Sequence, residues 1–152
     1  MHKEIFEKFK KIGMKYFYGD FFDSRVYVSH NLRKIQTINI LDIGCGSGVL
    51  LSCAPECQKI GIDVDFEALK EIKKLDKKIE PILCDAQFLP LKNNIFETIS
   101  AMHLFPVIKN MKGDWNKAIE EVLRVSKDKS TLLITGANSF LVFEVKTLLE
   151  KW

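Results

Sequence analysis

Two carboxylates and a run of glycines carry the clearest chemical signal in this sequence. A first apolar stretch ends beside Asp42 and leads directly into the turn Gly-Cys-Gly-Ser-Gly at 44–48. Because glycine carries no side chain, a ligand could contact the backbone of this turn. A second apolar stretch, 59–63, ends in Asp63, whose carboxylate could accept hydrogen bonds from both hydroxyls of a ribose. The pattern predicts a site for a nucleoside-containing cofactor at the carboxyl ends of neighbouring parallel strands.

The spacing of the glycines argues against one familiar class of ligand. The dinucleotide fingerprint is G-x-G-x-x-G, in which the third glycine lets the helix pack closely on the strand. Val49 stands at that third position here, and no Tyr-x-x-x-Lys-like catalytic pair is present in the sequence. A nicotinamide-dependent oxidoreductase is therefore the least favoured enzyme class. A glycine turn that binds no ligand is the structural alternative.

The segments that must position these residues alternate between strand and helix. Short apolar runs predict five strands, at 38–43, 59–63, 79–84, 96–103 and 130–135. Amphipathic or capped stretches predict helices at 47–54, 65–75, 113–125 and 138–151. Because right-handed crossovers make such strands parallel, we expect an α/β fold with a mostly parallel sheet of order 3-2-1-4-5. Helices on both faces would make it a Rossmann-like three-layer sandwich.

One domain, 1–152, accounts for this alternation, with the Rossmann-like core at 37–152. The preceding residues, 1–36, read as N-terminal helices rich in aromatic side chains. They could fold over the cofactor as a lid, or pack under the sheet instead. Asp65 is expected to cap its helix. The helical side chains expected to face the core are Phe66, Leu69, Ile72, Leu75, Trp115, Ala118, Ile119, Val122 and Leu123.

Three motifs in register connect the sequence to a known family. ILDIGCGSG at 40–48 and GIDVD at 61–65 resemble the class I S-adenosylmethionine-dependent methyltransferases, of the methyltransferase domain 11/25 type. CDAQFLPL at 84–91 resembles the adenine-binding segment of that family. The fourth strand matches more loosely, because Glu97 replaces the usual shorter acid. The resemblance covers about 37–152 and implies S-adenosyl-L-methionine as the cofactor.

The resemblance also implies roles for particular residues. Backbone around Gly44 and Gly46 would contact the methionine part, and Asp42 would attract the ammonium or sulfonium. Asp63 would bind the ribose hydroxyls, with Val64 against one face of the adenine.

After the third strand, Asp85 would accept a hydrogen bond from the adenine amino group, and the amide of Ala86 would donate to the ring. Asp85 could equally cap the segment that follows it. Backbone near Ala101 and Met102 would close over the amino acid end. The predicted cofactor-binding residues are Asp42, Gly44, Cys45, Gly46, Asp63, Val64, Asp85, Ala86 and Ala101.

The methyl acceptor and the catalytic groups are less well defined by the sequence. His103 is a candidate general base, because the pKa of a histidine lies near neutrality, but it could also be a packed or solvated side chain. His-Leu-Phe-Pro at 103–106 differs from the Asn/Asp-Pro-Pro-Tyr/Phe motif of amino methyltransferases. We therefore expect an unidentified, small-molecule acceptor. The alternative is a cofactor-binding, non-catalytic subunit of a methyltransferase complex.

The C-terminal part predicts a surface for a partner. Members of the family usually add two strands after the fifth helix, and we expect a shortened C-terminus without them. The fifth strand would then be an apolar edge, beside an apolar helix at 138–151. A homodimer or a partner subunit could cover this edge and helix.

Composition excludes several other classes. The 152 residues are 47% hydrophobic, and the net charge of +3 does not indicate nucleic acid binding. No apolar run approaches the roughly 20 residues that span a membrane, and no signal-peptide pattern opens the chain, so we expect a cytoplasmic protein. Cys53 and Cys57 are four residues apart, but the further ligands of a metal site are missing, so no metal is expected.

Overall fold

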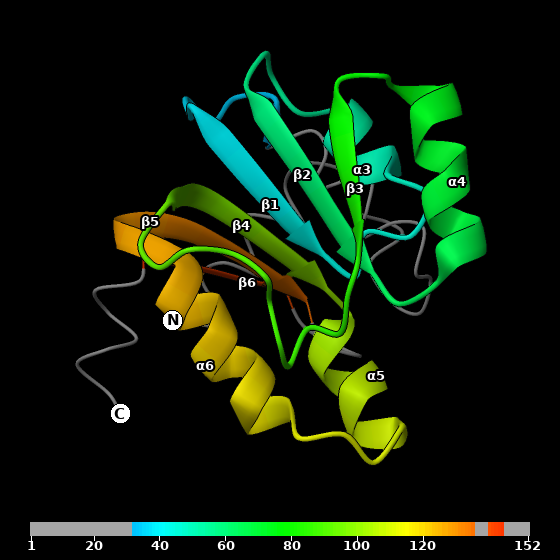
Figure 1. Ribbon diagram of the computed structural model, residues 1–152. Coiled ribbons are helices and arrows are strands. Elements are labelled where there is room, and N and C mark those ends of the chain that lie inside the picture. The colour runs from blue at the N-terminus through cyan, green and yellow to red at the C-terminus, as the bar shows by residue number, and fades with distance from the viewer. Residues whose placement is uncertain (1–31, 136–139, 145–152) are drawn as a thin grey trace, which may run out of the picture.

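A single six-stranded sheet organises the protein. The computed structural model describes residues 32–135 and 140–144 (Figure 1). The strands lie in the order β3-β2-β1-β4-β5-β6, and the first five are parallel while β6 is antiparallel to β5. The parallel order 3-2-1-4-5 predicted from the sequence is confirmed. The strands are β1 (Asn39–Ile43), β2 (Gln58–Asp63), β3 (Ile79–Leu83), β4 (Phe96–Met102), β5 (Ser126–Thr135) and β6 (Phe140–Glu144).

Helices cover both faces of this sheet. Two of them, α3 (Val49–Ser52) and α4 (Phe66–Leu75), pack on the face that carries Ile40. On the opposite face, which carries Leu41, the helices α5 (Leu104–Asn110) and α6 (Trp115–Val125) complete a second buried cluster (Figure 1). Because successive strand residues point to opposite faces, β1 supplies both clusters and is buried along its whole length.

Some side chains at the helix ends are more exposed than the sequence predicted. Asp65 caps α4 as expected, because its carboxylate accepts the N–H groups of Glu67 and Ala68. Phe66 and Leu75 of α4, however, are 57% and 51% exposed, and Trp115 of α6 is 39% exposed. All three stand in the first or last position of their helix. The inward positions predicted for these three side chains are wrong.

The C-terminal prediction also requires correction. The sequence predicts a helix at 138–151, but residues 140–144 form β6, paired with β5 through contacts such as Leu133 with Val142. The fifth strand is therefore not an edge of the sheet. A short apolar run with aromatic and β-branched residues fits a strand as well as a buried helix, which is why periodicity alone misassigned it. The remaining residues of that predicted helix lie outside the described part of the chain.

The N-terminal lid segment, 1–36, falls almost wholly outside the described residues, which begin at Leu32. Leu32 is fully buried in the cluster that contains Ile40. In the described ranges, no helix has the length and apolar character that crossing a membrane requires. The same ranges hold no group of three or more histidine, cysteine or acidic side chains arranged to bind a metal ion.

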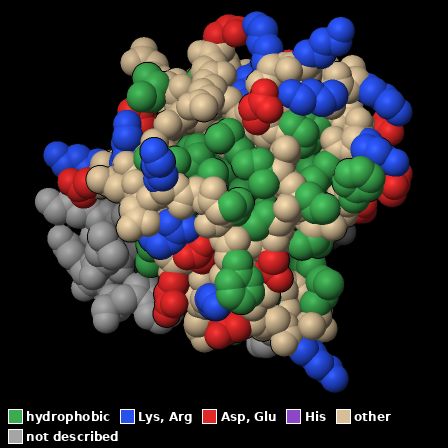
Figure 2. Space-filling model, viewed as in Figure 1, with side chains coloured by type: hydrophobic (Ala, Val, Ile, Leu, Met, Phe, Trp, Pro, Cys, Tyr) green, Lys and Arg blue, Asp and Glu red, His purple; other side chains and the backbone are tan. Residues whose placement is uncertain are grey.

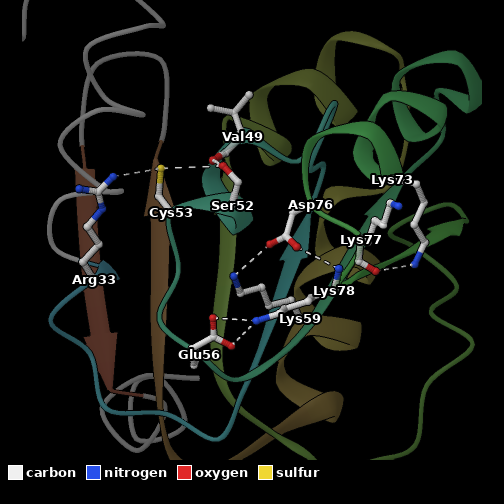
Figure 3. Close-up of polar contacts among 10 residues, drawn as sticks. All are labelled: Arg33, Val49, Ser52, Cys53, Glu56, Lys59, Lys73, Asp76, Lys77 and Lys78. Carbon is white, nitrogen blue, oxygen red and sulfur yellow. Dashed lines mark hydrogen bonds and ion pairs between the residues drawn. The ribbon is translucent and has the colours of Figure 1, made fainter.

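A polar cluster joins the amino end of β2 to the turn between α4 and β3 (Figure 3). The Lys59 side chain is only 4% exposed, and its Nζ lies 3.3 Å from Oδ2 of Asp76. The other carboxylate oxygen of Asp76 accepts the N–H of Lys78 at 2.9 Å. That backbone hydrogen bond, followed by the contact with Lys59, holds the pKa of Asp76 below its usual value. The cluster thus compensates a buried ammonium at the end of the sheet away from the strand carboxyl ends.

Candidate functional site

A cavity of about 370 Å³ opens at the carboxyl ends of β1, β2, β3 and β4. Its volume lies within the range of small-molecule pockets. Figure 2 shows hydrophobic side chains gathered near the middle of the face seen in Figure 1, with most charged side chains toward the periphery. Of the residues predicted from the sequence, those that line the cavity are Gly44, Gly46, Asp63, Val64, Asp85, Ala86, Met102 and His103.

The glycine turn shapes one wall of the cavity. Gly44 and Gly46 have φ values of 76° and 53°, in the left-handed region that glycine adopts without steric cost. The N–H groups of Gly44 and Cys45 both donate to the carbonyl of Ile62, at 2.8 and 3.0 Å. A Cβ on Gly44 would lie 3.3 Å from Cδ1 of Leu104, so a side chain there would narrow the cavity. The turn is therefore held against β2 with its backbone accessible to a ligand.

Asp63 is oriented by the turn and by its own chain. Its Oδ2 accepts the N–H of Gly46 at 2.7 Å, and its Oδ1 accepts the N–H of Asp65 at 2.9 Å. Each oxygen of a carboxylate can accept more than one hydrogen bond. Asp63 can therefore hold the turn in place and still accept two hydroxyl groups from a ligand in the cavity.

Asp85 lies across the cavity and begins a tight turn. Its Oδ1 accepts the N–H of Gln87 at 2.8 Å, and its carbonyl accepts the N–H of Phe88 at 3.0 Å. Asp85 thus caps the segment after β3, as one interpretation of the sequence required. Because it also lines the cavity, the capping contact and a contact with a ligand are compatible.

Three predicted residues are not among those that line the cavity. Asp42 is 1% exposed and accepts the hydroxyl of Ser100 at 2.6 Å, on the sheet face opposite Ile43, which does line the cavity. Cys45 is 4% exposed, and its sulfur would lie 2.8 Å from a Cβ on Gly61. Asp42 points away from the cavity that Ile43 lines, because neighbouring residues along a strand point to opposite faces of the sheet.

The third of these residues, Ala101, is 1% exposed within the core. The two residues after it, Met102 and His103, line the cavity instead. His103 has a φ of 56°, a conformation that costs a residue with a side chain roughly 1–2 kcal/mol. This left-handed residue turns the chain out of β4 and directly into α5.

Helix α5 was not predicted from the sequence, although its residues line the cavity. Three residues of α5 and the residue that directly follows it recur at the spacing of one helix face and line the cavity. They are Leu104, Val107, Ile108 and Met111. That spacing was the signal available in the sequence. The proline at 106 does not prevent this helix, because proline is tolerated in the first turn.

A second unpredicted feature is a clamp from α6 onto the connection between β3 and β4. Glu121 accepts the N–H of Leu89 at 2.7 Å and the Nε of Arg124 at 2.6 Å. Arg124 in turn donates to the carbonyls of Leu89 and Leu91 and to the side chain of Asn93. The hydrogen bond from Arg124, aided by the Leu89 N–H, outweighs partial burial and holds the pKa of Glu121 below its usual value. The clamp positions the segment that follows Asp85.

Replacing Glu121 with glutamine is expected to lower the free energy of unfolding at neutral pH, because the clamp loses its charge. The folded pKa of Glu121 lies below the unfolded value of about 4.3, so its stabilisation is present above that pH and is lost as pH falls through the folded pKa. The difference between wild type and Glu121→Gln should therefore shrink below about pH 4. Denaturant unfolding at several pH values measures this, with the exposed neighbour Glu120→Gln as control. A difference that does not shrink between pH 7 and pH 3 would contradict the assignment.

Comparison with known proteins adds to this geometry. A family profile described as "Methyltransferase domain" matches residues 41–134. A curated relative, the uncharacterized protein MJ0638 of Methanocaldococcus jannaschii, is 26% identical over 99 residues, which are 65% of this chain and 40% of that protein.

Solved structures share the fold. The YcgJ protein of Bacillus subtilis superposes with a TM-score of 0.63 at 23% identity, over 73% of this chain and 49% of YcgJ. The plantazolicin methyltransferase BpumL, solved with S-adenosylhomocysteine and a monoazolic desmethylPZN analogue, has a TM-score of 0.60 at 25% identity, over 75% of this chain and 45% of BpumL. This chain spans less than half the length of each of these three proteins.

Proposed function

The chain belongs to the methyltransferase-domain family, and from that premise we propose that it uses S-adenosyl-L-methionine to methylate a small-molecule acceptor. One observation carries the proposal: the bare glycine turn, Asp63 and Asp85 converge on one cavity at the carboxyl ends of parallel strands. In sheets of this kind, ligands bind in that crevice. BpumL, which shares the fold at 25% identity, was solved with S-adenosylhomocysteine.

The chemistry of the cavity walls fits the parts of this cofactor. The oriented carboxylate of Asp63 suits the ribose hydroxyls, since hydrogen bonds to an ionised acceptor are stronger than neutral ones. Asp85 suits the amino group of the adenine, and the amide of Ala86 a ring nitrogen. Val64, 60% exposed at the end of β2, and the apolar face of α5 offer surfaces for the base. Backbone at Gly44 and Gly46 leaves room for the methionine part.

The cofactor supplies a methyl group already activated on a sulfonium. The residues of this chain then need to orient that methyl group toward the acceptor and exclude water. Such alignment can account for about 7–11 kcal/mol of a barrier. His103 lines the cavity directly after β4 and is the candidate to accept a proton, if the acceptor loses one during transfer.

A second candidate function is that of a cofactor-binding subunit within a methyltransferase complex. In its favour, the described residues that line the cavity offer contacts for the cofactor, but they mark no separate site for an acceptor. A homodimer or partner subunit would then contribute that site. Both candidates require the same cofactor contacts and differ only in turnover.

Two measurements test these proposals. Calorimetric titration with S-adenosylhomocysteine should give saturable binding, whereas NADH should give none. Transfer of a labelled methyl group to a panel of small-molecule acceptors, with and without cell extract, should then detect turnover. Absence of binding to S-adenosylhomocysteine would overturn both candidates, while binding without transfer in any mixture would favour the subunit.

A further inference from the structure

The side-chain amide of Gln87 is engaged at both ends. Its Nε2 lies 3.1 Å from each carboxylate oxygen of Asp85. Its Oε1 accepts the N–H of Asp114, the residue that caps α6, at 2.8 Å. Because the oxygen end is occupied by that N–H donor, the nitrogen end must face Asp85. The amide therefore has one defined orientation.

This orientation determines what Asp85 presents to the cavity. The side-chain amide and the backbone N–H of Gln87 together make three contacts to the carboxylate of Asp85. An N–H group only donates, so the oxygens that it contacts act as acceptors. Asp85 is thereby held as an acceptor at the wall of the cavity and is hindered from turning away into solvent.

Gln87 also has little freedom to move. It lines the cavity together with Gly113, on the loop between α5 and α6. A Cβ on Gly113 would lie 3.3 Å from Nε2 of Gln87 and 2.8 Å from Cγ2 of Ile108. The glycine thus makes room for the amide, which joins the β3–β4 connection to the start of α6.

We propose that Gln87 is a positioning residue that makes the cavity select a 6-amino purine over a 6-oxo purine. The inference rests on the proposed binding of S-adenosyl-L-methionine. A 6-amino group can donate to the fixed carboxylate of Asp85, whereas a 6-oxo group brings a second acceptor against it. With the oxo group, the hydrogen bond from the amino group is lost and two acceptors face each other, so the 6-oxo purine binds more weakly. When the side-chain amide is removed, only the backbone N–H of Gln87 still contacts the carboxylate, so Asp85 has more freedom to turn away and the rejection weakens.

The test compares S-adenosylhomocysteine with S-inosylhomocysteine, its 6-oxo analogue, by calorimetric titration. The variants are Gln87→Leu, which keeps the size of the side chain, and Gln87→Ala; either one suffices if the other does not fold. The dissociation constant of S-inosylhomocysteine divided by that of S-adenosylhomocysteine is expected to fall by about fivefold relative to wild type, the contribution of about one hydrogen bond of ordinary strength. Gln58→Leu, an exposed position at the amino end of β2, is the matched control and should keep the wild-type ratio.

The ratio separates positioning from a general structural effect, which would weaken both ligands equally. An unchanged ratio in a folded Gln87 variant, or a wild-type protein that binds both ligands equally well, would overturn the proposal. Neither outcome affects the proposed function, which fails only if wild type does not bind S-adenosylhomocysteine.

Discussion

Replacing Asp63 with alanine is expected to weaken the binding of S-adenosylhomocysteine by about 1.5–3 kcal/mol, the contribution of hydrogen bonds to a charged group. Asp63 is proposed to accept the ribose hydroxyls directly. The variant also removes the acceptor of the Gly46 N–H, 2.7 Å away, so the glycine turn loses a contact that holds it against β2. Both effects act on the same ligand. Calorimetric titration of the variant and of wild type measures the change.

A matched control separates the site from a general loss of charge. Asp128→Ala removes an exposed carboxylate from β5, on a strand whose residues do not line the cavity among those described. It is expected to leave the affinity unchanged. Thermal unfolding without ligand should show that Asp63→Ala remains folded. Wild-type titration heat in a folded Asp63→Ala protein would rule out the role given to this residue.

Replacing Asp76 with asparagine is expected to lower the free energy of unfolding by about 3 kcal/mol, the lower end of the cost of breaking a buried ion pair, because the Asp76 side chain is 20% exposed. The Lys59 side chain, 4% exposed, would lose the carboxylate that now lies 3.3 Å away. A buried charge without its partner costs more than the pair contributes. Asparagine still offers an oxygen to the N–H of Lys78, so the change isolates the charge. Urea denaturation measures the difference.

The double variant Lys59→Met with Asp76→Asn should recover most of that loss, because the buried ammonium is removed together with its partner. Glu71→Ala provides the comparison with an exposed ion pair, since Glu71 and Lys74 lie 2.8 Å apart with side chains 54% and 73% exposed. Its effect should stay below about 1 kcal/mol. If the double variant is no more stable than Asp76→Asn alone, the loss does not come from the uncompensated lysine.

Much of the fold could be predicted because its signals are local. An apolar strand, a glycine turn and a second strand ending in an acid occur within 25 residues, and the parallel order 3-2-1-4-5 follows from the alternation of strands and helices. The carboxyl ends of parallel strands lie at one edge, so Asp63 and Asp85 had to approach the same crevice. The apolar run at 140–144 was ambiguous by the same local criteria, and only pairing with β5 made it a strand.

The sequence alone therefore determined which residues stand at the strand ends and which backbone is bare of side chains, because these depend on neighbours along the chain. Tertiary structure decided which side chains reach the cavity. Asp42 and Ile43 are adjacent in sequence, yet strand pairing directs Asp42 toward Ser100 and leaves Ile43 on the cavity wall. It also brought Gln87 to Asp114 and Glu121 to Leu89, contacts across 27 and 32 residues. Such contacts depend on how helices dock on the sheet, which amphipathic spacing predicts as a buried face but not as a particular partner.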